Sequence, residues 1–510
     1  MTPKNKSEIA VIDTSAGLCL MQMPEDGNAP CPTCLVRRLE EAGFALRSEI
    51  SVQSEDDFRT ELTAPLPARD GRAAPVVRVD SKSNRATLHT LLPVPDCPAC
   101  SARQIRSRRN PPLRDAVLFD PLLGIESCLE WEGLDHSADS LCFTVIGRVH
   151  VPPGMAWVGA HAQSSTAPDA RAAQLGEAVE RYVALRPEVH RLTTANWDDL
   201  PRDKIPLELL NGFDREQLSI TGYRRVTADT RLAWIRGRLL RGGREIFVPA
   251  AWVYLARSWN REENRINALI SHGLAAHKSL LAARENAMLE VYERFHTTRA
   301  WHEQNFGIPL DTAVVPRHLR PILDRIRRSK LRVHLRSLTG PSQMPVVLAA
   351  VAGGCYPWLR IGTAARRTTP EAAERALLEA CGAWQFARRK QDEPYVARLA
   401  PVTSAAAHVD YYSTAKRSAR IVNILEKEEA RPRRNSTEEG TVDIRKELLR
   451  LVRHAVEVII TTPDCRACGF EVVKIIAPGL PLLHFGRVGT PRLFAARFGL
   501  PRVATPHPYL

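Results

Sequence analysis

A chain of 510 residues, with 44% hydrophobic and 25% charged residues, has the composition of a folded protein and is too long for one ordinary core, so two or three domains are expected. Lys and Arg outnumber Asp and Glu by 71 to 57, and the net charge of +14 favours anionic partners without specifying their kind. No stretch approaches the roughly 20 apolar residues of a membrane helix, and Met1–Ile9 is polar rather than signal-like, so we expect a cytoplasmic protein.

Near the N-terminus, two Cys-x-x-Cys pairs stand out among the eleven cysteines: Cys31 with Cys34, and Cys97 with Cys100. Two such pairs supply four thiolates, the tetrahedral set that zinc prefers, and the proline within each pair favours a tight turn. We therefore predict a structural zinc site that closes a small module over residues 1–115. Two redox-active pairs are the alternative, which we disfavour because neither lies in a βαβ setting.

After Pro111-Pro112 the chain alternates strand candidates with long amphipathic segments. The strand candidates are Leu141–His150, Glu245–Leu255, Met344–Val351 and Val472–Ile476. The predicted helices are Asp169–Val183, Ser279–Phe295 and Pro370–Ala387. This alternation predicts an α+β fold of mixed sheets and long helices over residues 116–510. The charged run Glu426–Glu439 is interpreted as an exposed loop, and the proline-bearing end from Pro501 as an extended tail.

The first two helices carry the same acidic motif. Glu177–Arg181 recurs in outline 113 residues later as Glu290–Arg294, and the third helix keeps one carboxylate, Glu379, with Gly382 at the second position. Glutamates three residues apart share a helix face and repel, so the pair needs a counter-charge such as a divalent cation with an anionic ligand. Solvated helix faces are the alternative. The repetition favours an internal pseudo-repeat whose acidic faces converge on one site.

The three-helix pattern, the segment Ser271–His277 and the proline-bearing terminus together resemble the YcaO family over about residues 116–510. Asp120–Ile125 resembles the opening of the family and Gly469–Leu480 its late strand. The cysteine module ahead is similar to the zinc-binding part of ThiF-like partner proteins. The whole chain thus resembles a SagD-type maturation protein of thiazole/oxazole-modified peptides.

The resemblance implies an ATP-dependent cyclodehydratase that acts on a ribosomally made precursor peptide, with ATP, Mg2+ and a structural Zn2+ as cofactors. In the family, a Cys, Ser or Thr side chain attacks the preceding amide carbonyl. ATP phosphorylates the oxyanion, and loss of phosphate gives a thiazoline or oxazoline. The leader-bearing precursor, a ThiF-like partner, a flavin-dependent azoline dehydrogenase and a homodimer are the partner expectations of this resemblance, with peptide binding as a role for the zinc module.

Site residues follow from the resemblance by motif match. Seven residues would hold ATP with its magnesium. The metal ligands among them are Glu177, Glu180, Glu290, Glu293 and Glu379, and the other two residues are Ser271 and Gly273. Arg181 and Arg294 would pair with phosphates or with the carboxylates, and Pro506 and Pro508 in the tail would help to order the active site.

This chain departs from the family pattern at several positions. Ala162-Gln163-Ser164 stands where a Gly-Lys-Gly loop is usual, Ala282 replaces an opening glutamate, and Gly382 replaces a glutamine, with Gln385 and Arg388 one turn on. Three histidines are candidates to replace the missing contacts, namely His161, His272 and His277. One explanation is a divergent enzyme, which the two glutamate motifs favour. The other is a catalytically degenerate scaffold that binds the precursor or a catalytic paralogue.

A nucleic-acid-binding protein with a zinc module is a third hypothesis. The basic residues are scattered, as in Arg103–Arg109 and Arg431–Arg434, and the sequence holds neither a two-Cys, two-His zinc finger nor an aromatic-rich RNA-binding strand. Clustered carboxylates also repel phosphate unless a metal intervenes. Nucleic acid is therefore the disfavoured partner.

Overall fold

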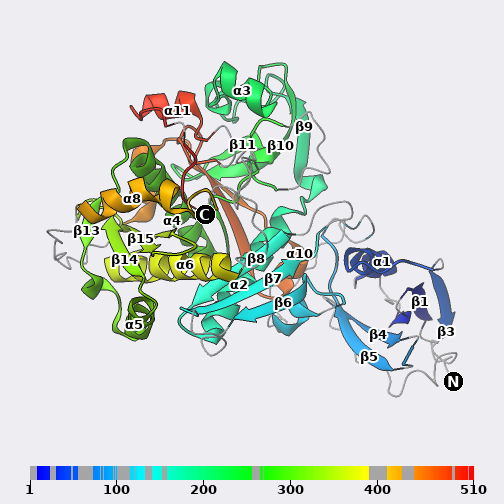
Figure 1. Ribbon diagram of the computed structural model, residues 1–510. Helices are drawn as coiled ribbons and strands as arrows, with labels where there is room; N and C mark the ends of the chain where they lie inside the picture. Colours follow the sequence, from blue (N-terminus) through cyan, green and yellow to red (C-terminus); the bar gives the residue numbers. More distant parts are fainter. Residues whose placement is uncertain are drawn as a thin grey trace.

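The computed structural model places a small N-terminal module beside a larger body (Figure 1). The residues that the structure describes are 8–15, 17–22, 30–47, 50–54, 73–80, 82–83, 85–95, 97, 99, 115–120, 122–132, 140–151, 158–255, 265–267, 269–389, 410–427, 442–484, 489–503 and 505–509. Among them, no helix combines the length and the apolar character needed to cross a membrane. Most of the predicted loop Glu426–Glu439 lies outside these residues.

The N-terminal module is a five-stranded antiparallel sheet with one helix. Its strand order is β3-β1-β2-β4-β5, and α1 (Pro32–Glu41) follows the first hairpin. The strands are β1 (Glu8–Thr14), β2 (Gly17–Gln22), β3 (Ser51–Ser54), β4 (Ala74–Asp80) and β5 (Ala86–Leu91). Apolar residues of the sheet and of α1, including Ile12, Leu35 and Leu39, form a small core that also contains three cysteines. Because this sheet is antiparallel, the described cysteines do not lie in the βαβ setting that a redox-active pair would be expected to have.

Three further antiparallel sheets form the body in the described part of the chain. Their orders are β6-β7-β8, then β11-β10-β17-β18-β12 with β9 paired to β10, and β13-β14-β15-β16. The strands are β6 (Glu126–Glu132), β7 (Phe143–Val149), β8 (Val158–Ser164), β9 (Leu192–Asn196), β10 (Arg231–Leu239), β11 (Glu245–Pro249), β12 (Leu274–His277), β13 (Ile308–Leu310), β14 (Arg332–Ser337), β15 (Val346–Ala352), β16 (Leu359–Ala365), β17 (Val456–Ile459) and β18 (Glu471–Ile476).

Each of these three sheets ends in an edge strand that leads into a long helix. Strand β8 is followed by α2 (Ala167–Ala184), β12 by α4 (Leu280–Glu303) and β16 by α6 (Thr369–Arg389). We call these pairs units one, two and three. The remaining helices are α3 (Arg215–Thr221), α5 (Arg320–Arg328), α8 (Ala415–Lys427), α9 (Ile444–Leu451), α10 (Pro463–Ala467) and α11 (Arg492–Arg497). The α+β class with an internal pseudo-repeat is confirmed.

Local signals explain where the three unit helices begin. The Thr166 hydroxyl accepts a hydrogen bond from the Asp169 amide at the start of α2, and Ser279 caps α4 in the same way. Before α6, Thr368 and Glu371 form a reciprocal capping box, each side chain accepting from the other's amide at 3.3 Å. All three predicted helices are present at these places.

Helix α4 runs eight residues beyond its predicted end at Phe295. Its continuation includes Thr297 and Thr298, which have weak helix propensity but are fully buried, and their hydroxyls donate to the carbonyls of Glu293 and Arg294. Tertiary packing therefore overrides local propensity. In contrast, the strand predicted over Glu245–Leu255 ends at Pro249, where Ala250–Trp252 forms a 3-10 turn. The other three strand predictions match β7, β15 and β18.

The N-terminal module is joined to the body by a buried polar cluster. Arg38 of α1 donates to Asp464 of α10 at 3.1 Å, Arg186 lies 2.7 Å from Glu41, and the Tyr182 hydroxyl of α2 donates to Asp464 at 2.6 Å. Both guanidinium groups lie over the Tyr182 ring. Because opposite charges compensate each other without water, this cluster fixes α1 against the end of α2.

Candidate functional site

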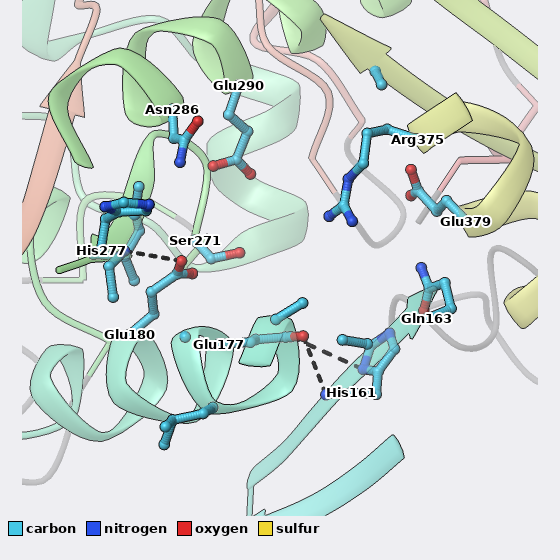
Figure 2. A pocket seen from close by; sticks show the side chains of 18 of the residues that line it. His161, Gln163, Glu177, Glu180, Ser271, His277, Asn286, Glu290, Arg375 and Glu379 are labelled. Atoms are coloured by element: carbon cyan, nitrogen blue, oxygen red, sulfur yellow. Dashed lines mark hydrogen bonds and ion pairs between the residues drawn. The ribbon is translucent and has the colours of Figure 1, made fainter. Parts of the chain in front are cut away.

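A pocket of about 840 Å³ lies where the three units meet, and its walls come from β8, α2, β12, α4, β16 and α6. All five glutamates of the acidic motifs line it, so carboxylates up to 202 residues apart, Glu177 and Glu379, share one cavity. Figure 2 shows four of these side chains extending into the same space. The expected convergence of acidic helix faces is thus observed, and separate solvated faces are ruled out.

Each of the five carboxylates accepts a hydrogen bond from the backbone of an edge strand or the residue just before it. The donor amides and distances are His161 to Glu177 at 3.1 Å, Ala276 to Glu180 at 3.0 Å, Gly273 to Glu290 at 3.0 Å, Ala365 to Glu293 at 3.2 Å and Thr363 to Glu379 at 3.1 Å. The Thr363 hydroxyl also donates to Glu293 at 2.7 Å. The outer side of an edge strand has unpaired N–H groups, and here the glutamates satisfy them. The carboxylates are therefore held in place before any ligand binds.

These contacts follow a cyclic rule. The first glutamate of each unit accepts from its own strand, while the second accepts from the strand of the next unit: Glu180 from β12 and Glu293 from β16. The second donor lies two or three residues beyond the first along the strand. Each second carboxylate thus ties two units together at the pocket.

Crowding of buried acids sets the charge state of the site. Burial is the main cause that raises the pKa of Glu180 to about 8; Arg181 acts in the opposite direction, and the neighbouring Glu290 adds to the rise. Burial likewise raises the pKa of Glu379 to about 7 and raises that of Glu290, with Glu293 adding to both. Glu180 therefore holds a proton near neutral pH until a cation replaces it.

The two motif arginines lie among these carboxylates. Arg181 donates to Glu177 at 3.0 Å, while Arg294 lies 3.9 Å from Glu290 and 3.7 Å from Glu293. Burial alone would raise the pKa of Glu177, but nearby positive charge and donated hydrogen bonds outweigh it and hold the pKa below its usual value. In this state of the site both arginines face carboxylates.

Lys474 on β18 interacts with the carboxylates of the site from outside the residues that line the pocket, and the motifs did not reveal it. Its ammonium donates to the Ile270 carbonyl at 2.9 Å and is almost fully buried. Burial lowers its pKa to about 8, although Glu290 and Glu180 act in the opposite direction. A lysine within the apolar strand Glu471–Ile476 was the available signal, since a buried amine requires acidic or carbonyl partners.

The three histidines proposed as replacements all line the pocket. The His161 ring nitrogen lies 3.9 Å from Glu177, and His277 accepts from the Ser279 amide at the start of α4. His272 is buried, and burial together with Arg294 lowers its pKa well below the usual value, so it is neutral.

The positions where the chain departs from the family pattern are also resolved. Residues 162–164 belong to β8 and form a strand rather than a phosphate-binding loop. Gln385 accepts from the amides of Leu141 and Cys142, and Arg388 donates to the Tyr356 carbonyl. Both side chains are therefore engaged away from the pocket and do not replace the missing glutamine.

Of the other predicted residues, Ser271 lines the pocket but Gly273 serves it through its amide alone. Gly273 has a φ of +74°, and a Cβ there would lie 2.3 Å from the Ile475 carbonyl oxygen, so only glycine fits. Pro506 and Pro508 are not among the lining residues; the tail packs Tyr509 against Trp301, and the Tyr412 hydroxyl donates to the Pro506 carbonyl.

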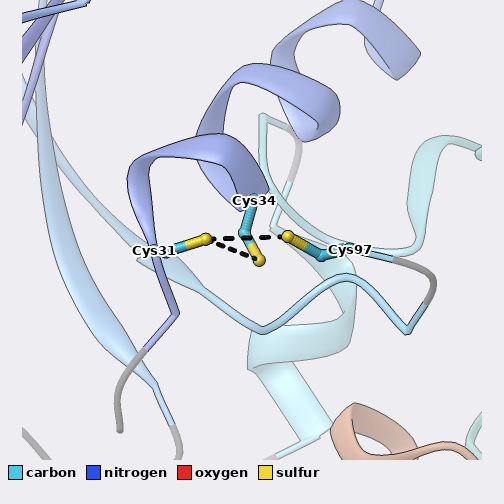
Figure 3. A group of neighbouring side chains, drawn as sticks. All are labelled: Cys31, Cys34 and Cys97. Atoms are coloured by element: carbon cyan, nitrogen blue, oxygen red, sulfur yellow. Dashed lines mark hydrogen bonds between the residues drawn. The ribbon is translucent and has the colours of Figure 1, made fainter. Parts of the chain in front are cut away.

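The predicted zinc ligands form a second cluster (Figure 3). The Cys31 sulfur lies 3.8 Å from that of Cys34 and 3.6 Å from that of Cys97, while Cys100 lies outside the described residues. Four sulfurs at about 2.3 Å from a tetrahedral zinc are about 3.8 Å apart. The donor set and its spacing therefore fit zinc.

Comparisons with known proteins agree with this geometry. A family model described as YcaO cyclodehydratase, ATP- and Mg2+-binding, matches residues 161–481. No curated protein sequence gave a significant match.

Solved structures show a similar fold. A heterocyclase in complex with substrate and cofactor is 18% identical with a TM-score of 0.73, over 96% of this chain and 75% of that chain. The heterocyclase TruD is 17% identical with a TM-score of 0.63, over 97% and 73%. YcaO from Methanopyrus kandleri bound with AMPPCP and Mg2+ is 19% identical with a TM-score of 0.50, over 70% and 86%.

Proposed function

Because this chain belongs to the YcaO family of ATP- and Mg2+-binding cyclodehydratases, we propose that it uses ATP to form thiazolines or oxazolines at Cys, Ser or Thr residues of a ribosomally made precursor peptide. The observation that carries the proposal is the convergence of five oriented carboxylates on one cavity. A scaffold without catalysis has no need for such a cluster, since buried acids of raised pKa destabilise a fold at neutral pH.

The pocket residues fit magnesium and a nucleoside triphosphate. Carboxylate oxygens are the ligands that Mg2+ prefers, and a cavity of about 840 Å³ has the size of a cofactor site. Glu290 is near enough to raise the pKa of Glu180, so a cation shared by these two carboxylates would relieve their repulsion. Bound magnesium would neutralise phosphate charge while a phosphoryl group is transferred.

The proposed reaction removes the amide oxygen as phosphate. The side-chain thiol or hydroxyl loses its proton as it adds to the preceding carbonyl carbon, and the amide oxygen takes the γ-phosphoryl group from ATP, which leaves as ADP. The carbon–oxygen bond then breaks as the amide proton is lost, which gives the azoline, ADP and phosphate. Arg181 and Arg294, now facing carboxylates, would contact the phosphates once a cation neutralises those acids.

For the N-terminal module we propose a structural zinc held by Cys31, Cys34, Cys97 and Cys100. Three thiols at tetrahedral spacing support it. The module, taken as residues 1–115, is proposed to bind the precursor peptide or a ThiF-like partner. We further propose that an enzyme such as a flavin-dependent dehydrogenase oxidises the azoline, and that the chain forms a homodimer. We place the reaction in the cytoplasm, where ATP and newly made peptide are both present.

The direct test is turnover by the full chain with a Cys-, Ser- and Thr-rich candidate precursor encoded beside it. We expect ATP hydrolysis that needs Mg2+ and rises with peptide, and peptide that loses the mass of one water per ring. Peptide binding without hydrolysis would support the scaffold explanation instead. Salt-sensitive retention of nucleic acid, with no effect of peptide, would support the third hypothesis.

A further inference from the structure

The cyclic contacts around the pocket leave one position to be filled. Glu180 of unit one reaches β12 of unit two, and Glu293 of unit two reaches β16 of unit three. The equivalent position of unit three is Gly382, on the face of α6 that approaches β8 of unit one. A side chain there would close the ring of three units, but glycine has none.

The side chain of Gln163 fills this place from the opposite direction. A Cβ built on Gly382 would lie 3.0 Å from the Cγ of Gln163 and 3.1 Å from its Cβ and Cδ. Gln163 also stands at the matching strand position, two residues after His161, just as Ala365 stands two residues after the first donor of β16. At the contact between units three and one, the side chain thus comes from strand β8 rather than from helix α6.

The Gln163 carboxamide is available to a ligand. It lines the pocket, and Figure 2 shows it near Glu379 and Arg375, where unit three approaches unit one. Within the part of the chain that the structure describes, its amide makes no hydrogen bond to protein. An amide adds no negative charge beside Glu379, whose pKa burial already raises, and it offers N–H donors to an anionic oxygen.

We propose that Gln163 is a binding residue for the phosphate chain of the nucleotide, and that Gly382 is the space this residue requires. The inference rests on the proposed function, because it takes the pocket to be the nucleotide site. In units one and two, the polar side chain at this position comes from the helix. In unit three, we propose that it comes from β8 of unit one. A side chain at either position requires space at the other, so we expect residues 163 and 382 to vary together.

The test is a double-mutant cycle on the full chain, read by calorimetric binding of Mg2+ with a non-hydrolysable ATP analogue. Gln163→Ala is expected to weaken binding about tenfold, since it removes a hydrogen bond to a charged group. Gly382→Gln alone should also weaken binding, because two amides compete for one place. Combining the two changes should restore affinity to within about threefold of the original protein, as the amide is then supplied from the helix.

Folding is checked on every variant by thermal melting, and Gly382→Ala provides a smaller change if Gly382→Gln does not fold. Gln343→Ala, which changes an amide in the turn before β15, is the control and should bind normally. Unchanged binding by Gln163→Ala, with binding still weakened by Glu290→Gln, would overturn this inference alone. No binding by the unmodified protein would overturn the proposed function and this inference together.

Discussion

At the scale of single residues, the pocket concentrates acids whose protonation depends on what else is present. Glu180 illustrates the point, because burial and Glu290 raise its pKa to about 8 while its oxygen accepts from the Ala276 amide. Such a carboxyl group is neutral in the isolated protein near pH 7 and ionised when a cation arrives. Metal binding and proton release are thereby linked.

This linkage predicts a pH dependence of stability. Between its unfolded pKa, about 4.5, and its folded pKa, about 8, Glu180 holds a proton in the folded state and has lost it in the unfolded state. Stability without metal therefore falls as pH rises through this window. We expect the melting temperature in EDTA to fall less steeply from about pH 5 to about pH 8 in Glu180→Gln than in the original protein. Parallel curves for the two proteins would contradict the prediction.

Glu290→Gln is predicted to lower Mg2+-dependent ATP turnover at least about a hundredfold, because the amide keeps the shape but not the charge of a metal ligand. The fold should be retained, since the amide oxygen still accepts from the Gly273 N–H. Glu285→Gln is the matched control on the same helix, where the carboxylate pairs with Arg367 outside the pocket. Equal turnover by Glu290→Gln and the original protein would remove Glu290 from the metal ligands.

At the scale of elements, the sequence predicted the unit helices but not the edge strands that orient their glutamates. Helical spacing and caps identify α2, α4 and α6, and the repeated motif indicates that they meet. Strand β12 reads Leu-Ala-Ala-His and has no β-branched residue; pairing with β18 makes it a strand. The placement of Lys474 beside Glu290 depends on a partner far away in sequence, and so does the contact between Gln163 and Gly382.

Thr363 tests the contribution of an edge strand. Its hydroxyl donates to Glu293 at 2.7 Å, and the residue is almost fully buried. Thr363→Val keeps the side-chain shape but removes this donor to a charged acceptor, so urea unfolding should show a loss of about 1.5–3 kcal/mol. Thr193→Val on exposed β9 is the control and should change stability by less than about 0.5 kcal/mol. A loss no larger than that of the control would show that the hydroxyl is not needed to hold Glu293, which also accepts from the Ala365 amide.

At the scale of the whole molecule, the module that carries the cysteines is coupled to the site through α2. Helix α1 begins immediately after Cys31 and presents Arg38 to Asp464, while Tyr182 of the same cluster lies one residue beyond Arg181. These partners are 426 and 282 residues apart, so no local pattern could have predicted them. The Cys-x-x-Cys pairs, in contrast, predicted the proximity of Cys31, Cys34 and Cys97.

Cys31→Ser is predicted to lower both bound zinc and thermal stability, because a structural zinc contributes directly to folding. Metal analysis of the purified protein and thermal melting provide the two measurements. Cys355→Ser, at an exposed and isolated thiol, is the control and should change neither. If the original protein contains no zinc after purification without chelators, the cluster has another role.

The carboxylates are oriented by main-chain N–H groups, and this has a consequence for how such a protein varies. Every amino acid except proline offers the same N–H, so the strands can exchange nearly all their side chains while the acids stay where they are. Related proteins can then keep the same cavity although the sequences of its walls have diverged. In this chain the glutamates and the course of the backbone are the constrained features, and most side chains of the strands can vary.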